Sequence, residues 1–108
     1  MNVPQPRINV TGSAVRDEIF LVRALITHPM ETGLRKDESG QAIPRQIINR
    51  FTCRYNGAIV FSTELYEAVA ANPYIEFHVR ARDSGTLEYE WEEDGGATYT
   101  LQSSLTVS

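Results

Sequence analysis

The side chains able to do chemistry in this chain of 108 residues are few: one cysteine, two histidines and one acidic run. Cys53 alternates in phase with Phe51 and Tyr55, as a small buried side chain does in a strand. A nucleophilic thiolate needs an exposed, electropositive setting, and the neighbouring sequence offers none. We therefore expect Cys53 to be an unreactive core residue, with neither a disulfide nor a thiolate metal cluster.

The two histidines, His28 and His78, lie too far apart in sequence to suggest a local metal-ligand pair. His28 precedes Pro29 at the end of an apolar run, where a ring that hydrogen-bonds to shape a turn is favoured over a general base. An acid–base pair of His28 with Glu31 stays open as the enzymatic alternative. His78 is expected on the surface of its strand.

The acidic run near the C-terminus consists of Glu88, Glu90, Glu92, Glu93 and Asp94. Three of these carboxylates alternate along one face of a predicted strand, about 7 Å apart. A calcium loop instead brings its ligands together from a bent segment with a glycine at the turn. The run therefore predicts a solvated strand face that resists aggregation, and no cofactor or metal site is expected.

The residues above must be positioned by β-strands, because apolar residues alternate with polar ones along most of the chain and turn signals follow at short intervals. Predicted strands cover 7–10, 18–27, 45–55, 58–62, 74–82, 87–92 and 99–107, and 63–72 is predicted to be a helical turn or corner. Asn56-Gly57 is a strong hairpin signal because both residues of a tight turn take positive φ. About seven short strands predict an all-β, immunoglobulin-like sandwich. We expect a single domain over 1–108, with residues 1–12 as a loose N-terminal segment.

The run 18–27 is apolar on both faces, which is unusual for a strand with one wet side. One face carries Phe20, Val22, Ala24 and Ile26, and the other carries Ile19, Leu21, Arg23 and Leu25. Either the strand is central in the sandwich, or a partner covers its second face. Both interpretations remain open.

A polar loop from Met30 to Pro44 follows, and its length exceeds that of ordinary connections, which favours a functional or mobile segment. Arg35, Lys36, Arg45 and Arg50 bracket this loop, either for solubility or as a charged rim that meets an acidic partner.

The charge and the length of the apolar runs exclude some classes of partner. A net charge of -4 argues against nucleic acid and against an anionic membrane surface. The longest apolar stretch, 19–26, is far shorter than the ~20 residues that cross a bilayer. A signal peptide, with a basic segment followed by an apolar one, is not visible in the sequence, and this by itself predicts a cytoplasmic location.

The segment Ile26 to Phe51, ITHPMETGLRKDESGQAIPRQIINRF, resembles the SoxZ family, the small subunit of the SoxYZ carrier complex of bacterial sulfur oxidation. The resemblance covers roughly 18–107 and is most specific at His-Pro-Met-Glu-Thr-Gly. It also includes Asn56-Gly57, Val60–Ser62, Ala71–Tyr74, Trp91, Asp94, Gly95 and Tyr99.

This resemblance implies a non-catalytic, immunoglobulin-like scaffold that forms a heterodimer with SoxY. The C-terminal cysteine of SoxY carries the covalently bound sulfur intermediates of thiosulfate oxidation to sulfate, and other Sox enzymes bind transiently. The resemblance also implies the periplasm, reached by co-export with SoxY. An uncovered apolar face would allow a homodimer of the isolated chain. A generic immunoglobulin-like protein-binding module remains the alternative function.

The predicted partner surface combines the second face of the 18–27 strand with the start of the long loop and the basic residues near its end. It consists of Leu21, Leu25, His28, Pro29, Met30, Glu31, Thr32, Gly33, Arg45, Asn49 and Arg50.

Overall fold

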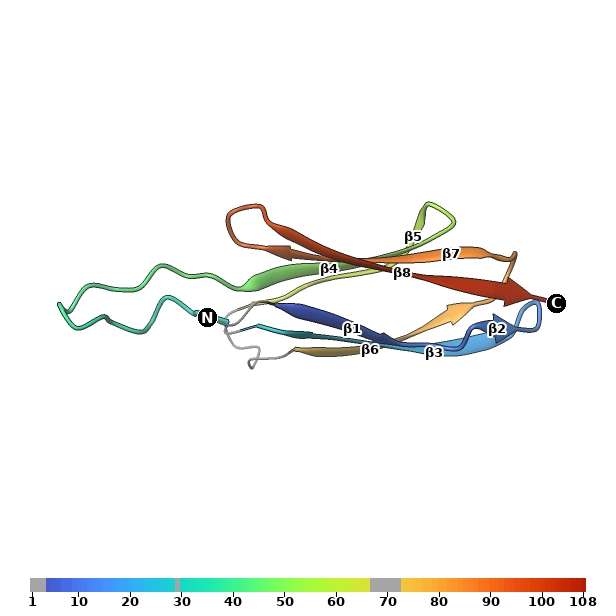
Figure 1. Ribbon diagram of the computed structural model, residues 1–108, viewed down its shortest axis with the longest axis horizontal. Coiled ribbons are helices and arrows are strands. Elements are labelled where there is room, and N and C mark those ends of the chain that lie inside the picture. Colours follow the sequence, from blue (N-terminus) through green and yellow to red (C-terminus); the bar gives the residue numbers. More distant parts are fainter. Residues whose placement is uncertain (1–3, 29, 67–72) are drawn as a thin grey trace.

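The computed structural model describes residues 4–28, 30–66 and 73–108, which form eight β-strands in two facing sheets (Figure 1). The three-stranded sheet has the order β1 (Gln5–Asn9), β3 (Ile19–Thr27), β6 (Tyr74–Arg80). The five-stranded sheet has the order β2 (Ser13–Ala14), β8 (Thr98–Val107), β7 (Gly85–Glu93), β4 (Ile48–Tyr55), β5 (Ala58–Glu64). All pairings are antiparallel except that of β2 with β8. The predicted immunoglobulin-like β-sandwich is confirmed.

The core lies between the inner faces of the two sheets, as the alternation of apolar residues predicts. The three-stranded sheet buries Phe20, Val22, Ala24, Ile26, Phe77 and Val79, and the five-stranded sheet buries Phe51, Cys53, Leu87, Tyr89 and Trp91. Rings meet across the layers: the centroids of Phe51 and Phe77 are 5.7 Å apart, and Phe61 stacks on Phe77 at 4.4 Å. These contacts join β4 and β5 to β6.

Several element boundaries differ from the sequence prediction. Gln5–Asn9, within the segment expected to be loose, form β1 and pair with β3. Ser13–Ala14 add a strand too short to carry a periodic signal. β4 begins at Ile48 rather than at position 45, because the backbone of Gln46 pairs with Glu31 across the arm, and the side chains of Arg45 and Gln46 bond to Asp94. In the stretch predicted as a helical turn or corner, 63–64 end β5 and 67–72 lie outside the described residues.

The predicted hairpin at Asn56-Gly57 is confirmed, with φ of 49° and 86° at its two residues. It joins β4 to β5 at the end of the sandwich where β6 also ends (Figure 1). Among the described residues there is no helix with the length and apolar character to cross a membrane.

Residues 31–46 form a narrow projection, here called the arm, that extends beyond one end of the sandwich (Figure 1). It gives the molecule overall dimensions of 60 × 22 × 19 Å. The two sides of the arm pair at Glu31 with Gln46 and at Lys36 with Ala42. At its tip, the Asp37 carboxylate accepts hydrogen bonds from the backbone amides of Ser39 and Gln41. The segment predicted as a polar loop is therefore a hairpin-like extension.

Candidate partner-binding site

The arm leaves the sandwich at His28, whose side chain is 2% exposed. Its Nδ1 atom accepts a hydrogen bond from the Met30 amide at 2.9 Å, and this confirms the prediction that His28 shapes a turn. Met30 has a φ of 52°, and its Sδ atom accepts from the Ile48 amide at 3.3 Å. Pro29 lies outside the described residues. The start of the arm is thus held in place by the buried side chains of His28 and Met30, which belong to the arm base, the part of the arm next to the sandwich.

The second ring nitrogen of His28 faces Glu93 at the end of β7, with 3.4 Å between Nε2 and Oε2. Since Nδ1 accepts a hydrogen bond, the proton of a neutral ring lies on Nε2 and points to this carboxylate. Glu31, the alternative acid–base partner, instead forms an ion pair with Arg35, with 2.6 Å between Oε1 and Nη2. The His28–Glu31 pair that the enzymatic alternative required is therefore absent from this geometry.

Glu93 also accepts hydrogen bonds from the Tyr99 hydroxyl and the Gln46 side-chain amide, so it ties β7, β8 and the arm together. Partial burial raises the pKa of Glu93, but the donors Tyr99, Gln46 and His28 outweigh it and hold the pKa below its ordinary value of 4.5. The same hydrogen bond raises the pKa of Tyr99. The carboxylate is thus a charged anchor beneath the arm.

Asp94 holds the returning side of the arm. Arg45 binds its carboxylate through two nitrogens, Nε at 2.8 Å and Nη2 at 2.9 Å, and the Asn49 amide donates at 3.0 Å. Burial raises the pKa of Asp94, but the hydrogen bonds from Arg45, Asn49 and the Ile47 amide outweigh it and leave the pKa lowered. A two-point arginine–carboxylate contact fixes direction as well as distance, so it orients the arm.

The arm base therefore includes residues that the sequence prediction missed: Gln46, Glu93, Asp94 and Tyr99. The prediction of a solvated face holds for Glu88, Glu90 and Glu92, on the outer side of β7, but is wrong for Glu93 and Asp94. The available signal was their position, because Glu93 continues the inward phase of Tyr89 and Trp91, and Asp94 follows the end of the strand.

Leu21 and Leu25 lie on the outer face of the three-stranded sheet, partly exposed and outside the core. Leu25 pairs with Tyr74 of β6, which is 50% exposed, and Ile19 on the same face is 56% exposed. β3 is the central strand of its sheet, as the first interpretation expected, but its outer face is not covered within the described part of the sandwich. An apolar outer face of this kind is typical of a contact surface.

Arg50 lies on the other side of the molecule, on the outer face of β4, beside Glu64 at 3.3 Å. The outer faces of two stacked sheets point in opposite directions, so one flat surface cannot hold both Leu25 and Arg50. Thr32 and Gly33 follow the base into the arm, where the Gly33 backbone approaches Arg45. The structure thus divides the predicted set into the arm with its base and two opposite faces.

Cys53 is fully buried on the inner face of β4, and burial raises its pKa to about 12. It is the unreactive core residue that the sequence predicts. Across the described ranges, His, Cys, Asp and Glu side chains form no group of three or more that could hold a metal ion.

The chain was compared with protein-family models, curated proteins and solved structures. The family model described as "Sulphur oxidation protein SoxZ" matches residues 8–104. The comparison with curated protein sequences found no match.

Solved structures of superoxide reductase (neelaredoxin) from Ignicoccus hospitalis share the fold. Three of them are 14% identical and superpose with TM-scores of 0.71, 0.69 and 0.68. Each match covers 95% of this chain, and 79%, 79% and 80% of the reductase chains. At this identity the likeness concerns the β-sandwich alone.

Proposed function

This chain belongs to the SoxZ family of sulphur oxidation proteins, and from that premise we propose that it is the non-catalytic scaffold of a two-chain sulfur carrier. Its partner in this proposal is SoxY, whose C-terminal cysteine carries sulfur intermediates during the oxidation of thiosulfate to sulfate. The observation that carries the proposal is the family match over 8–104. The pair acts in the periplasm after export together, and other Sox enzymes dock on it transiently.

The burial of Cys53, the only cysteine in the sequence, supports the proposal that the partner carries the sulfur. A thiol that carries sulfur intermediates between enzymes must be exposed and must ionise, because the thiolate is the nucleophile. Cys53 has no exposed surface, and its pKa is raised to about 12. The cargo therefore belongs on the partner chain, and this chain supplies the surface that holds the partner.

The two outer faces of the sandwich differ in character, and this guides the choice of partner surface. The five-stranded sheet presents paired charges such as Arg54 with Glu90, at 3.0 Å. The three-stranded sheet presents Ile19, Leu21 and Leu25 beside the pair Arg23–Glu76, at 3.6 Å. An apolar patch left in water costs free energy that a partner recovers on binding. We infer that SoxY covers the outer face of β3 and contacts the arm beside it, with buried His28 and Met30 as supports.

Co-purification of the two chains tests this surface. Leu25→Glu is expected to abolish recovery of tagged SoxY with this chain, because it places a charge in the apolar contact. Val15→Glu is the matched control, since Val15 is 62% exposed at the end opposite the arm, and Arg50→Ala probes the other outer face. Both controls are expected to keep the pair. Intact pairing in a Leu21→Glu, Leu25→Glu double variant would refute the assignment.

A further inference from the structure

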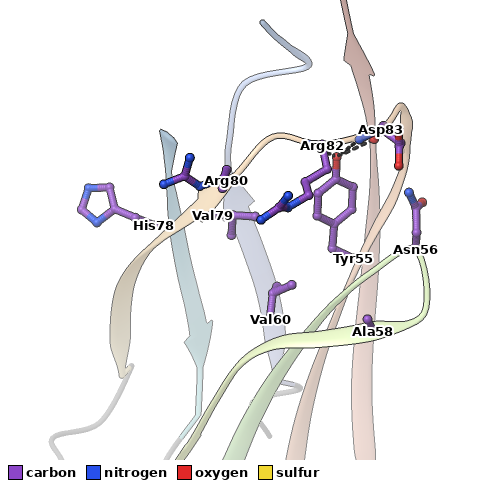
Figure 2. Close-up of a pocket in the computed structure, with 9 residues that line it drawn as sticks. All are labelled: Tyr55, Asn56, Ala58, Val60, His78, Val79, Arg80, Arg82 and Asp83. Carbon is purple, nitrogen blue, oxygen red and sulfur yellow. Dashed lines mark hydrogen bonds between the residues drawn. The ribbon is translucent and has the colours of Figure 1, made fainter. Parts of the chain in front are cut away.

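A groove of about 440 Å³ opens between the edge strands β5 and β6, at the end of the sandwich opposite the arm. Its apolar side is formed by Ala58 and Val60 of β5 and by Val79 of β6. Figure 2 shows Arg82 turned into the groove between Val79 and Tyr55, whereas Arg80 points away from Tyr55, toward His78, at the rim. The groove thus combines an apolar floor with positive charge.

No ion pair among the described residues neutralises the arginines that line the groove. Among the described residues, the arginines without a carboxylate oxygen within 4.0 Å are Arg7, Arg80 and Arg82, and two of these three line the groove. The groove's own acidic residue, Asp83, is bound to Arg16 at 2.9 Å. In a chain of net charge -4, this is a local site for a negative ligand.

Beside the groove, β5 has an unpaired edge, because β4 is its only neighbour among the described strands. Edge strands usually carry lysine, proline, inward charges or a β-bulge, each of which hinders pairing with another chain. The sequence of β5, AIVFSTE, has no lysine, proline or charge before its terminal Glu64, so a single bulge is its only such protection. A bulge opposite Cys53 and Arg54 leaves two consecutive apolar residues exposed, Ile59 at 61% and Val60 at 41%. This edge can accept a further strand.

We propose that the groove binds an extended, acidic segment of a partner protein, which adds a strand to β5. Its backbone pairs with the β5 edge, its apolar side chains pack on Ala58 and Val60, and its carboxylates meet Arg82 and, at the rim, Arg80. Charge favours this occupant over a second copy of the chain, because edge-to-edge pairing of two β5 strands would bring two sets of unpaired arginines together. The site is separate from the arm and from the face of β3 assigned to the carrier subunit.

Binding of a defined peptide tests the proposal. The probe is a fluorescent ten-residue peptide of alternating Glu and Val, titrated with the full chain and followed by anisotropy. We expect saturable binding that weakens as salt is added, because exposed ion pairs are screened. A Lys-Val peptide of the same length and a Glu-Val peptide N-methylated at alternate positions are expected to bind at least about tenfold more weakly.

Two variants with the same change of charge locate the site. Arg82→Glu is expected to raise the dissociation constant of the Glu-Val peptide about fivefold or more, and Arg7→Glu, at the outer sheet face, less than about twofold. Amide NMR shifts should concentrate on 58–62 and 79–83. Equal effects of the two variants, or equal binding of the N-methylated peptide, would overturn the proposal. So would self-association through β5 that excludes the peptide, since the occupant would then be a second copy.

Discussion

Cys53 lies between Phe61 and Tyr89 on the neighbouring strands, so neighbouring side chains enclose its thiol on the inner face of the sheet. Burial raises its pKa to about 12. We therefore expect iodoacetamide at neutral pH to leave the folded chain unmodified and to alkylate it only in denaturant, as measured by intact mass. Cys53→Ala is expected to cost about 1 kcal/mol of stability and to leave SoxY binding unchanged. Rapid alkylation of the folded chain would contradict the account of this residue.

Glu93 provides a second residue-scale prediction, because its folded pKa lies below its ordinary value of 4.5. The stabilisation it gives is complete above that value and is lost as the pH falls through the lowered folded pKa. Urea unfolding should show the free energy of unfolding falling less between about pH 6 and about pH 3 in Glu93→Gln than in the wild type. Near neutral pH the free energy of unfolding of Glu93→Gln is expected to be about 1–2 kcal/mol lower than that of the wild type.

Glu92→Gln is the matched control for that measurement, because Glu92 is the preceding carboxylate and lies on the outer side of β7. It should keep the acid dependence of the wild type. If both variants respond to acid alike, the anchoring role of Glu93 beneath the arm is wrong.

Among the elements, the arm packs Gly33 against Arg45: the φ of Gly33 is 87°, and an added Cβ would lie in van der Waals contact with the Cβ of Arg45, at 3.4 Å, which leaves no room for larger side-chain atoms on that side. Gly40 at the tip has nearly the same φ, 85°, but open space around it. Gly33→Val and Gly40→Val share the backbone strain, so their difference isolates the contact with Arg45. We expect Gly33→Val to lower the free energy of unfolding, measured in urea, by about 1 kcal/mol more than Gly40→Val does. Equal losses would mean that the base tolerates displacement of Arg45.

The strands were predictable from sequence because alternation reports burial directly, as in Phe20, Val22, Ala24 and Ile26. The arm base was not, because it joins residues distant in the chain, such as Arg45 with Asp94 and His28 with Glu93. A local pattern gives no information on which carboxylate an arginine meets across a fold. The same limit explains why Leu25 and Arg50 were grouped on one surface although opposite sheets carry them.

At the scale of the whole molecule, the arm and the groove between β5 and β6 lie at opposite ends of an elongated sandwich (Figure 1). A chain with this layout can hold one partner along the β3 face and arm while its far end stays open to another. Such a division suits a subunit that presents a carrier to successive enzymes. The scaffold role requires that sulfur be attached to the partner and not to this chain.

Intact mass spectrometry of the co-purified pair tests that requirement most directly. The pair is incubated with thiosulfate in an extract of thiosulfate-grown cells, and the masses of both chains are then recorded under non-reducing conditions. We expect sulfur-containing mass increments on the SoxY chain and an unmodified mass for this chain. An increment on this chain at Cys53, or thiosulfate turnover by the isolated chain, would contradict it.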